Sequence, residues 1–511
     1  MSNPLRIGFL YFYVFVTGAS VMAIEIAASR FLAPYFGTSM IVWANIIGLC
    51  LLSLAIGYFV GGRWADKWPS GKLLMMLTLL SGTFVALLPL WGDLIFPLLS
   101  KGIMNTPVWV IFCSFFAVLI VFAPPIFLLA MVSPFAIRLL SGQTSDLGKV
   151  AGNLYACSTL GSLVGTFGTA MLTIPFIGAK ESIYIWSAAL ILVSSWGLRQ
   201  WGKSWLAILV IIPLLSYYLT SGNMTMAAGE KVLWSGDTFY QFVKVTEDRQ
   251  GDISLVYNEG GGIQSIKRAT NALNSNDYYN DYLSLPFLVD KPRELLILGS
   301  AGGTIASSLG QYVKPQLPDL KVTGVEIDPA VVQLSYDYFG LKQEDAEIVS
   351  QDARVFINNA NKKYDITIVD CYSNQIYIPA HLSTVEFFKT LKEHTTDQGL
   401  VALNINATTP DSKLLTSMIK TIDAVFPYTY MIKSSGINNY MVIGALHELD
   451  VNDLSKIDKN SPLQKLDLSR WDQMKRVEKG QYNSALLLTD NHAPTEMLTD
   501  SMIFNFITDS K

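Results

Sequence analysis

The stretch LLILGSAGGTIASSL, residues 295–309, decides the fold of the second half of the chain. An apolar run ends in a cluster of small residues, Gly299 to Gly303, and a helix-like segment follows. Small residues at such a turn let the backbone approach a phosphate, a ribose or another nucleotide-like ligand. The pattern therefore predicts a strand, a ligand-binding turn and a helix in direct succession.

The same alternation continues after this turn. Short β-rich segments (KVTGVEIDP, EIVSQDARVFI, YDITIVDCYS and GLVALNI) alternate with expected helices, two of them at 329–340 and 383–394. This alternation predicts an α/β fold with a doubly wound, Rossmann-type parallel sheet. Glu326, Asp352 and Asp370 each follow a predicted strand. Because ligands bind at the carboxyl ends of such strands, we expect these carboxylates and the glycine-rich turn to form one site.

Composition divides the chain near residue 221. The 511 residues are 51% hydrophobic and 15% charged, with a mean hydropathy of +0.35, which is too apolar for an ordinary soluble enzyme. Long apolar runs precede this position, and an ordinary charge density follows it. The net charge of −4 and the lack of a basic stripe argue against a nucleic-acid partner. The four cysteines show neither a disulfide framework nor metal-ligand spacing, so we expect no metal.

The first half of the chain contains segments long enough to cross a bilayer, which takes about 20 apolar residues per helix. The candidates are 7–29, 41–62, 72–92, 107–139, 150–174, 181–198 and 204–220. The fourth contains Pro124 and Pro125 and fits either one broken helix or two short passes, so seven and eight spans both stay open. The sequence thus predicts a multi-pass helical domain that contacts the lipid bilayer over residues 1–220.

Taken together, LLILGSAGGT, VTGVEIDPAVV, QDARVFI and YDITIVDCYS resemble the polyamine aminopropyltransferases, the spermidine synthase family. In the first half, EIAASRFLAPYFG, LAIGYFVGGRWADK and LYACSTLGSLVGT resemble the membrane-embedded branch described as fused transporter and spermidine synthase. The resemblance covers nearly the whole chain. It implies a transmembrane domain at 1–220, a small β-hairpin segment at 221–290 and an S-adenosyl-binding, methyltransferase-like domain at 291–511.

The resemblance also implies roles for individual residues. The residues expected to bind the S-adenosyl donor are Gln264, Gly299, Ala301, Gly303, Glu326, Asp352 and Ala353. Among these, Glu326 would hold the ribose and Asp352 would meet the adenine amino group. Asp370 and Tyr278 would be catalytic. The residues expected to bind the amine substrate are Tyr278, Tyr372, His381 and Asp490.

Two carboxylates of the soluble family members are missing. Those enzymes carry an aspartate in the glycine-rich loop, where this chain has Gly302. They carry another three residues after the first aspartate of the active loop, where this chain has Ser373. Both belong to amine recognition and deprotonation. The donor side of the site is therefore expected to be intact, and the amine side depleted.

Three functions agree with these observations. The first is an integral-membrane aminopropyltransferase that uses decarboxylated S-adenosylmethionine and a small polyamine such as putrescine. The second is an S-adenosylmethionine-dependent transferase for another, membrane-delivered substrate, which the missing carboxylates favour. The third is a transporter or sensor of a polyamine or adenosyl ligand, which Glu25 favours because carboxylates inside apolar helices usually face a partner or a water-filled cavity. A monomer and a homodimer both stay open.

The orientation of the soluble half involves a conflict. Basic residues mark cytoplasmic loops, and here they lie between spans two and three, four and five, and six and seven. With seven spans, this pattern places the N-terminus inside and the soluble half outside. An S-adenosyl donor is made in the cytosol, which requires the opposite. We expect the plasma (inner) membrane and a cytosolic soluble half, against the charge pattern.

Overall fold

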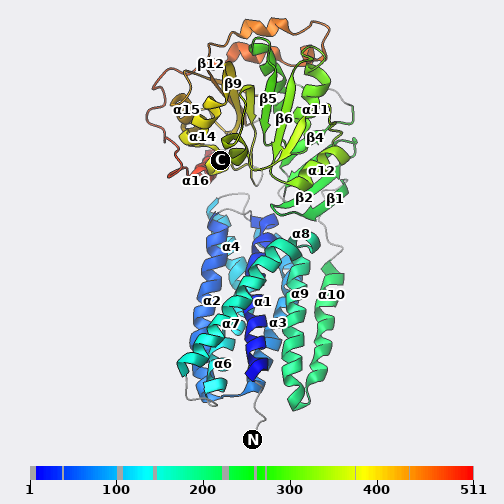
Figure 1. Ribbon diagram of the computed structural model, residues 1–511, viewed down its shortest axis with the longest axis vertical. Coiled ribbons are helices and arrows are strands. Elements are labelled where there is room, and N and C mark those ends of the chain that lie inside the picture. Colours follow the sequence, from blue (N-terminus) through cyan, green and yellow to red (C-terminus); the bar gives the residue numbers. More distant parts are fainter. Residues whose placement is uncertain are drawn as a thin grey trace. The chain divides into compact units, whose positions relative to one another are not determined.

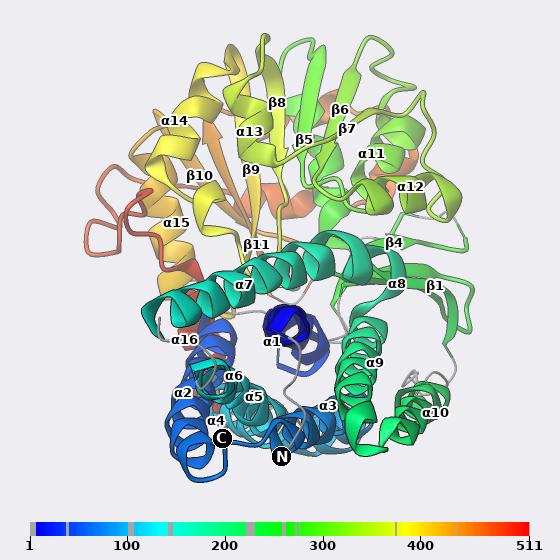
Figure 2. The same cartoon turned by 60° about the horizontal axis from the view of Figure 1, so that its bottom comes forward.

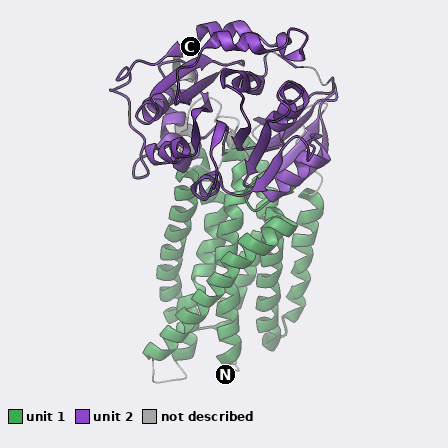
Figure 3. Ribbon diagram, turned by 45° about the horizontal axis from the view of Figure 1, so that its top comes forward, with its two compact units in different colours: residues 1–227, 236–242, 258–260 green, residues 228–235, 243–257, 261–511 purple. Residues whose placement is uncertain are grey.

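The computed structural model describes residues 7–36, 40–100, 107–141, 147–220, 230–257, 262–270, 273–274, 276–373, 376–436 and 438–509. The chain forms two compact units (Figure 3). Unit 1 contains residues 1–227, 236–242 and 258–260, and unit 2 contains residues 228–235, 243–257 and 261–511. The predicted domain boundaries after residues 220 and 290 stay predictions.

Unit 1 is built of helices. Its α-helices are α1 (Ile7–Phe36), α2 (Met40–Lys67), α3 (Gly71–Ser100), α4 (Pro107–Ala117), α5 (Ala123–Ala130), α6 (Val132–Ser141), α7 (Leu147–Gly168), α8 (Ile174–Ile177), α9 (Ala179–Leu198) and α10 (Ile211–Thr220). Six segments of the described chain are long and apolar enough to span a membrane. They are Ile7–Ala33, Met40–Lys67, Gly71–Leu99, Phe112–Ser141, Leu147–Ile177 and Ala179–Trp201.

The structure bears on two of the predicted spans. The fourth candidate, Phe112–Ser141, is a single continuous apolar segment that runs through Pro124 and Pro125. The last, Ser204–Thr220, is apolar but shorter than the other six. The number of crossings therefore stays a prediction.

Close packing of small residues organises unit 1 around its first helix. Viewed along its axis, α1 lies in the middle of the surrounding helices, and α7 crosses it (Figure 2). A Cβ atom on Gly161 or Gly165 of α7 would collide with the carbonyl oxygen of Phe15 or Ala19 of α1. Ser162 Oγ also donates to the Gly18 carbonyl at 3.2 Å. Small residues thus let the two backbones touch, as is common between membrane helices.

Charged groups of unit 1 have defined partners. Lys180 of α9 pairs with Asp93 of α3, with 2.8 Å between Nζ and Oδ1. The Arg30 guanidinium donates to the carbonyl of Phe239 at 2.8 Å. Glu25 lies on α1 and is only partly buried. Its role in a ligand pathway stays a prediction.

Two sheets follow in the chain (Figure 1). The first has the order β1-β2-β3-β4, formed by β1 (Lys231–Asp237), β2 (Phe242–Glu247), β3 (Ile253–Tyr257) and β4 (Ile263–Lys267). The second has the order β12-β10-β11-β9-β8-β5-β6-β7. Its strands are β5 (Glu294–Leu298), β6 (Lys321–Glu326), β7 (Glu347–Ser350), β8 (Tyr364–Val369), β9 (Thr395–Asn406), β10 (Tyr428–Lys433), β11 (Asn439–Ala445) and β12 (Lys475–Arg476).

The predicted α/β fold is confirmed, with one extension. Strands β7, β6, β5, β8 and β9 pair in parallel, as expected for a doubly wound sheet. Strands β11, β10 and β12 continue the sheet in antiparallel pairing, so the complete sheet is mixed. The helices after the strands include α11 (Thr304–Ser308), α12 (Pro329–Asp337), α13 (Ala353–Asn358), α14 (Val385–Glu393), α15 (Lys413–Asp423) and α16 (Thr495–Asp509).

The apolar side chains of β5 explain why the sheet is covered on both faces. Leu295 and Ile297 belong to one buried cluster, and Leu296 and Leu298 belong to another. Successive side chains of a strand point to opposite faces, so a fully apolar strand needs a core on each side. The chain winds from β5 outward to β6 in one direction and returns to β8 on the other side. Ligands bind at such a reversal of strand order.

Candidate active site

The glycine-rich turn that follows β5 lies directly against the residue that ends β8. Gly299 has φ +87°, and a Cβ atom there would collide with the Asp370 carbonyl oxygen. Glycine is therefore required both for the backbone conformation and for the close approach. The Asp370 N–H donates to the Leu298 carbonyl at 2.9 Å. The turn and Asp370 thus form one rigid edge.

Glu326, at the end of β6, holds this turn in place. Its Oε2 accepts the Ala301 N–H at 2.8 Å, and its Oε1 accepts the Asp328 N–H at 3.1 Å. The residue is buried, and this burial raises its pKa to about 7. Its carboxylate already accepts hydrogen bonds from the backbone of the turn. The contact with the ribose stays a prediction.

Asp352 and His381 meet at the neighbouring strand end. Asp352 Oδ1 accepts the N–H groups of Arg354 and Val355, both at 2.9 Å, which caps α13 at Ala353. Its Oδ2 lies 3.2 Å from His381 Nε2. The structure thus brings together two residues predicted to bind different ligands.

Asp490 is engaged in an ion pair. Its two carboxylate oxygens accept Arg354 NH1 at 2.7 Å and NH2 at 2.6 Å. Oδ1 also accepts the Thr384 hydroxyl at 2.7 Å. The hydrogen bonds from Arg354 hold the pKa of Asp490 below its ordinary value. In this arrangement Asp490 fastens the C-terminal segment beside α13.

Asp370 faces side chains instead of backbone groups. Its Oδ2 accepts the Tyr278 hydroxyl at 3.1 Å, and its Oδ1 accepts the Asn404 amide at 3.3 Å. Burial raises the pKa of Asp370 to about 6, and the two hydrogen bonds act against that rise. The group is therefore mostly ionised at pH 7 and close to the range of a general base.

Asn404 is a site residue that sequence reasoning missed. The side-chain NH2 group of Asn404 donates to Asp370, and its side-chain Oδ1 accepts the Asn439 amide at 2.9 Å. The backbone carbonyl of Asn404 accepts the Tyr372 hydroxyl at 2.8 Å. Tyr372 also accepts the Asn406 N–H at 3.1 Å. The signal in the sequence was the pair Asn404 and Asn406, which interrupts the apolar run of β9 on one face.

A cavity of about 30 Å³ lies between the turn and Asp370. Its lining includes six of the predicted residues, Gln264, Tyr278, Gly299, Ala301, Asp370 and Tyr372. The other predicted residues, Gly303, Glu326, Asp352, Ala353, His381 and Asp490, lie outside this lining. Such a volume holds roughly one water molecule.

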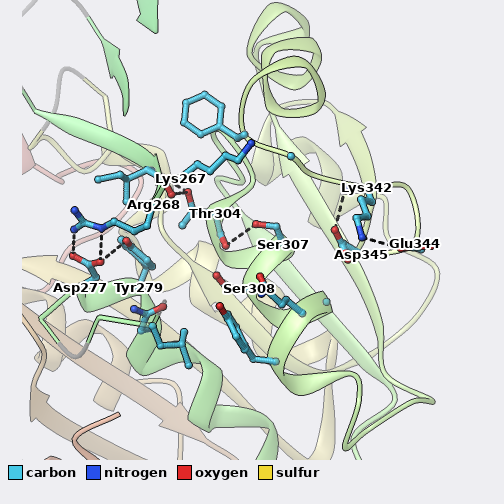
Figure 4. Close-up of a pocket in the computed structure, with 18 residues that line it drawn as sticks. Lys267, Arg268, Asp277, Tyr279, Thr304, Ser307, Ser308, Lys342, Glu344 and Asp345 are labelled. Carbon is cyan, nitrogen blue, oxygen red and sulfur yellow. Dashed lines mark hydrogen bonds and ion pairs between the residues drawn. The ribbon is translucent and has the colours of Figure 1, made fainter. Parts of the chain in front are cut away.

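A larger cavity, of about 470 Å³, adjoins it and shares Tyr279 and Thr304 as lining residues (Figure 4). Two of its cationic side chains, Arg268 and Lys342, are in ion pairs. Arg268 binds Asp277 at 2.7 Å, and the Tyr279 hydroxyl donates to Asp277 at 2.7 Å. Among the described residues, no group of three or more His, Cys, Asp or Glu is arranged to hold a metal ion.

Known proteins share this α/β half. Residues 278–446 match the family model of the spermine/spermidine synthase domain. A polyamine aminopropyltransferase of Vibrio vulnificus is 30% identical over 220 residues, which cover 41% of this chain and 70% of that protein. This chain belongs to the spermine/spermidine synthase family.

The family likeness extends beyond the α/β half. A polyamine aminopropyltransferase of Corynebacterium efficiens is 24% identical over 461 residues, which cover 84% of each protein, so the alignment reaches into the helical half. A probable polyamine aminopropyl transferase of Bifidobacterium longum is 33% identical over 173 residues, 34% of this chain and 37% of that protein.

Among solved structures, a probable spermidine synthase of Corynebacterium glutamicum is 18% identical to this chain, with a TM-score of 0.39. The match covers 52% of this chain and 97% of that chain. The protein is a transferase of the spermidine synthase family, and the six long apolar segments in the described part of the chain fit a fused membrane region.

Proposed function

We propose that the protein is an integral-membrane aminopropyltransferase. It moves the aminopropyl group of decarboxylated S-adenosylmethionine to the amine of a small polyamine such as putrescine. The observation that carries this proposal is the cavity where the Asp370 carboxylate and the Tyr278 hydroxyl meet beside the glycine-rich turn. A neutral amine placed there has a base within reach and lies next to the expected position of the donor.

The reaction requires one bond to form and one to break. The amine nitrogen attacks the methylene carbon bonded to the sulfonium sulfur, the new C–N bond forms, and the C–S bond breaks. Methylthioadenosine leaves with the electron pair of that bond. The surplus proton on the new secondary ammonium passes to Asp370, which is mostly ionised at pH 7 because its pKa is about 6.

The charges of the cavity support the decarboxylated donor over intact S-adenosylmethionine. The described residues that line it include one carboxylate, Asp370, and no lysine or arginine. The carboxylate of the intact donor would lack a cationic partner there, which is costly away from water. The ammonium of the decarboxylated donor instead gains an attractive field from Asp370.

The test uses the purified full-length protein with putrescine and either donor. Release of methylthioadenosine from the decarboxylated donor supports the proposal. Release of S-adenosylhomocysteine from the intact donor supports a transferase of the second kind, and binding of a donor without turnover supports a sensor or transporter. Either of the last two results overturns aminopropyl transfer.

We also propose that the protein resides in the plasma (inner) membrane with its α/β half in the cytosol, where the donor is made. A phosphatase reporter that is active only in the periplasm, fused after residue 225, should then be silent. The same reporter placed in the loop between α2 and α3 measures the side of that basic loop independently. An active fusion after residue 225 contradicts the placement and agrees with the charge pattern.

A further inference from the structure

Tyr282 has a hydroxyl group that the fold does not use. The side chain is fully buried, with 0% of its surface exposed. Its hydroxyl has no hydrogen-bond partner among the residues that the structure describes. Buried hydroxyls without a partner are uncommon because they lose their bonds to water without replacement. An exception next to a reaction site indicates a partner that arrives only during the reaction cycle.

The surroundings of this hydroxyl point to Asp370. Burial, and after it the Asp370 carboxylate, raises the pKa of Tyr282 well above its ordinary value, and the hydroxyls of Tyr278 and Tyr372 follow as the next contributors. The remaining acidic neighbour, Asp281, already accepts three hydrogen bonds from Ser434 and Ser435, at 2.5 to 2.8 Å. Asp370 accepts two and is thus the acceptor with more capacity left.

Tyr278 and Tyr282 come from the same short 3₁₀ segment, Tyr278–Leu288, which contacts β8. The sequence YYNDY places three tyrosines in five residues, and each has a different environment. Tyr278 donates to Asp370, Tyr279 donates to Asp277, and Tyr282 is left over. Tyr278, which binds Asp370, and Tyr282 are therefore carried on one short element.

The Asp370 carboxylate has unused acceptor positions, so its hydrogen-bond partners can change. A carboxylate offers about four acceptor positions, and Asp370 uses two, one for Tyr278 and one for Asn404. Tyr278 and Asp370 both line the reaction cavity. An amine that enters between them must take the Tyr278 hydroxyl, or its place, away from the carboxylate.

We propose that Tyr282 is a positioning residue for Asp370, whose hydroxyl donates to this carboxylate when Tyr278 turns to the acceptor amine. This inference rests on the proposed function, in which Asp370 takes the proton. The exchange keeps Asp370 oriented and ionised at the moment the amine is deprotonated. A site that loses this second donor should need a higher pH to ionise Asp370.

The test compares Tyr282→Phe with Tyr430→Phe in the full-length protein. Tyr430 is also a buried tyrosine of unit 2, and its hydroxyl accepts the Leu449 N–H at 3.0 Å, away from the site. We expect Tyr282→Phe to move the acidic limb of the pH profile of kcat, which reports the complex with bound substrate, upward by about one unit, a tenfold loss of rate below the limb. Donor KM and the limb of Tyr430→Phe should stay unchanged.

A hydroxyl with no role gives a different result. Phe fills the same space and removes an unpaired polar group, so Tyr282→Phe would then unfold at a higher temperature and keep the limb in place. That result overturns the inference. Absence of turnover in the unmodified protein with every amine and either donor overturns the proposed function itself, which separates the two failures.

A second variant keeps the inference testable if Tyr282→Phe does not fold. In Tyr278→Phe, the Tyr282 hydroxyl is expected to replace the missing donor, so the acidic limb should move by less than about half a unit. A shift of about one unit or more in Tyr278→Phe contradicts the exchange. Where Tyr282→Phe folds, the double variant should also move the limb by more than the sum of the two single shifts. Additive shifts would show that the two hydroxyls act independently and would contradict the exchange.

Discussion

The two carboxylates beside the glycine-rich turn, Glu326 and Asp370, lie at the ends of the strands on either side of β5, yet they are held in different ways. Glu326 accepts backbone N–H groups from Ala301 and Asp328. Asp370 accepts side-chain groups from Tyr278 and Asn404. A carboxylate that bonds the backbone is part of the fold, whereas one that bonds side chains can change partners without moving the chain.

This contrast predicts the largest effect at Asp370. Asp370→Asn keeps the shape of the side chain and removes the base, so turnover should fall by about 10²–10⁴-fold. Donor affinity should fall by a smaller factor, because the donor ammonium loses the attraction of the carboxylate. Parallel measurements of turnover and of donor binding by calorimetry test this. If turnover remains within about threefold, Asp370 orders its loop and has no role as a base.

At Glu326 the contrast predicts that a substitution lowers both the stability of the fold and the affinity for the donor. Glu326→Gln replaces one carboxylate oxygen by an NH2 group and leaves one of the two backbone N–H donors without an acceptor, which should lower the free energy of unfolding by about 1–3 kcal/mol. Donor affinity should fall with it, because the turn loses its anchor. Thermal unfolding and calorimetry measure the two effects. Weaker donor binding at unchanged stability would make Glu326 a ligand contact alone.

The pH profile sharpens the comparison in the unmodified protein. Because the pKa of Asp370 is raised to about 6 and its ionised form is the base, kcat should fall about tenfold per unit below that pH. The stability contributions of Glu326 and Asp370 change with pH in the same direction. Their raised pKa values mean that the folded state binds protons more tightly, so their contribution to stability is lost as pH rises from about 4 toward 6 or 7. A kcat that stays constant from pH 7 to pH 5 would contradict the role of Asp370.

Asp490 should give the smallest effect. Its carboxylate binds Arg354, and its side chain is 43% exposed, so Asp490→Asn should cost at most about 1 kcal/mol of stability. Its pKa is lowered, so this contribution is present at neutral pH and lost as pH falls through the folded pKa. KM for the amine should be unchanged. The control is Asp467→Asn, which breaks a different surface ion pair, between Asp467 and Arg470, and should also leave KM unchanged. A raised KM would support the predicted substrate contact.

Residues at strand ends were predictable because parallel strands bring their carboxyl ends to one edge whatever the details of packing. Asp370, Glu326 and the glycine-rich turn were found in this way. Asn404 was not, since a polar residue inside an apolar strand has meaning only when its neighbour on the sheet is known. The partner of Asp490 lies 136 residues away in the chain, so no local pattern could reveal it.

The sequence by itself determined the class of each half of the protein and the edge of the sheet where the site lies. Hydrophobic segment length and strand–helix alternation are local properties, and they survive any arrangement of the elements. Only the tertiary structure decided which donors each carboxylate meets. Glu326 accepts hydrogen bonds from backbone N–H groups, Asp370 accepts them from side chains, and the Tyr282 hydroxyl has no partner among the described residues. These pairings depend on distances between segments that are far apart in the chain.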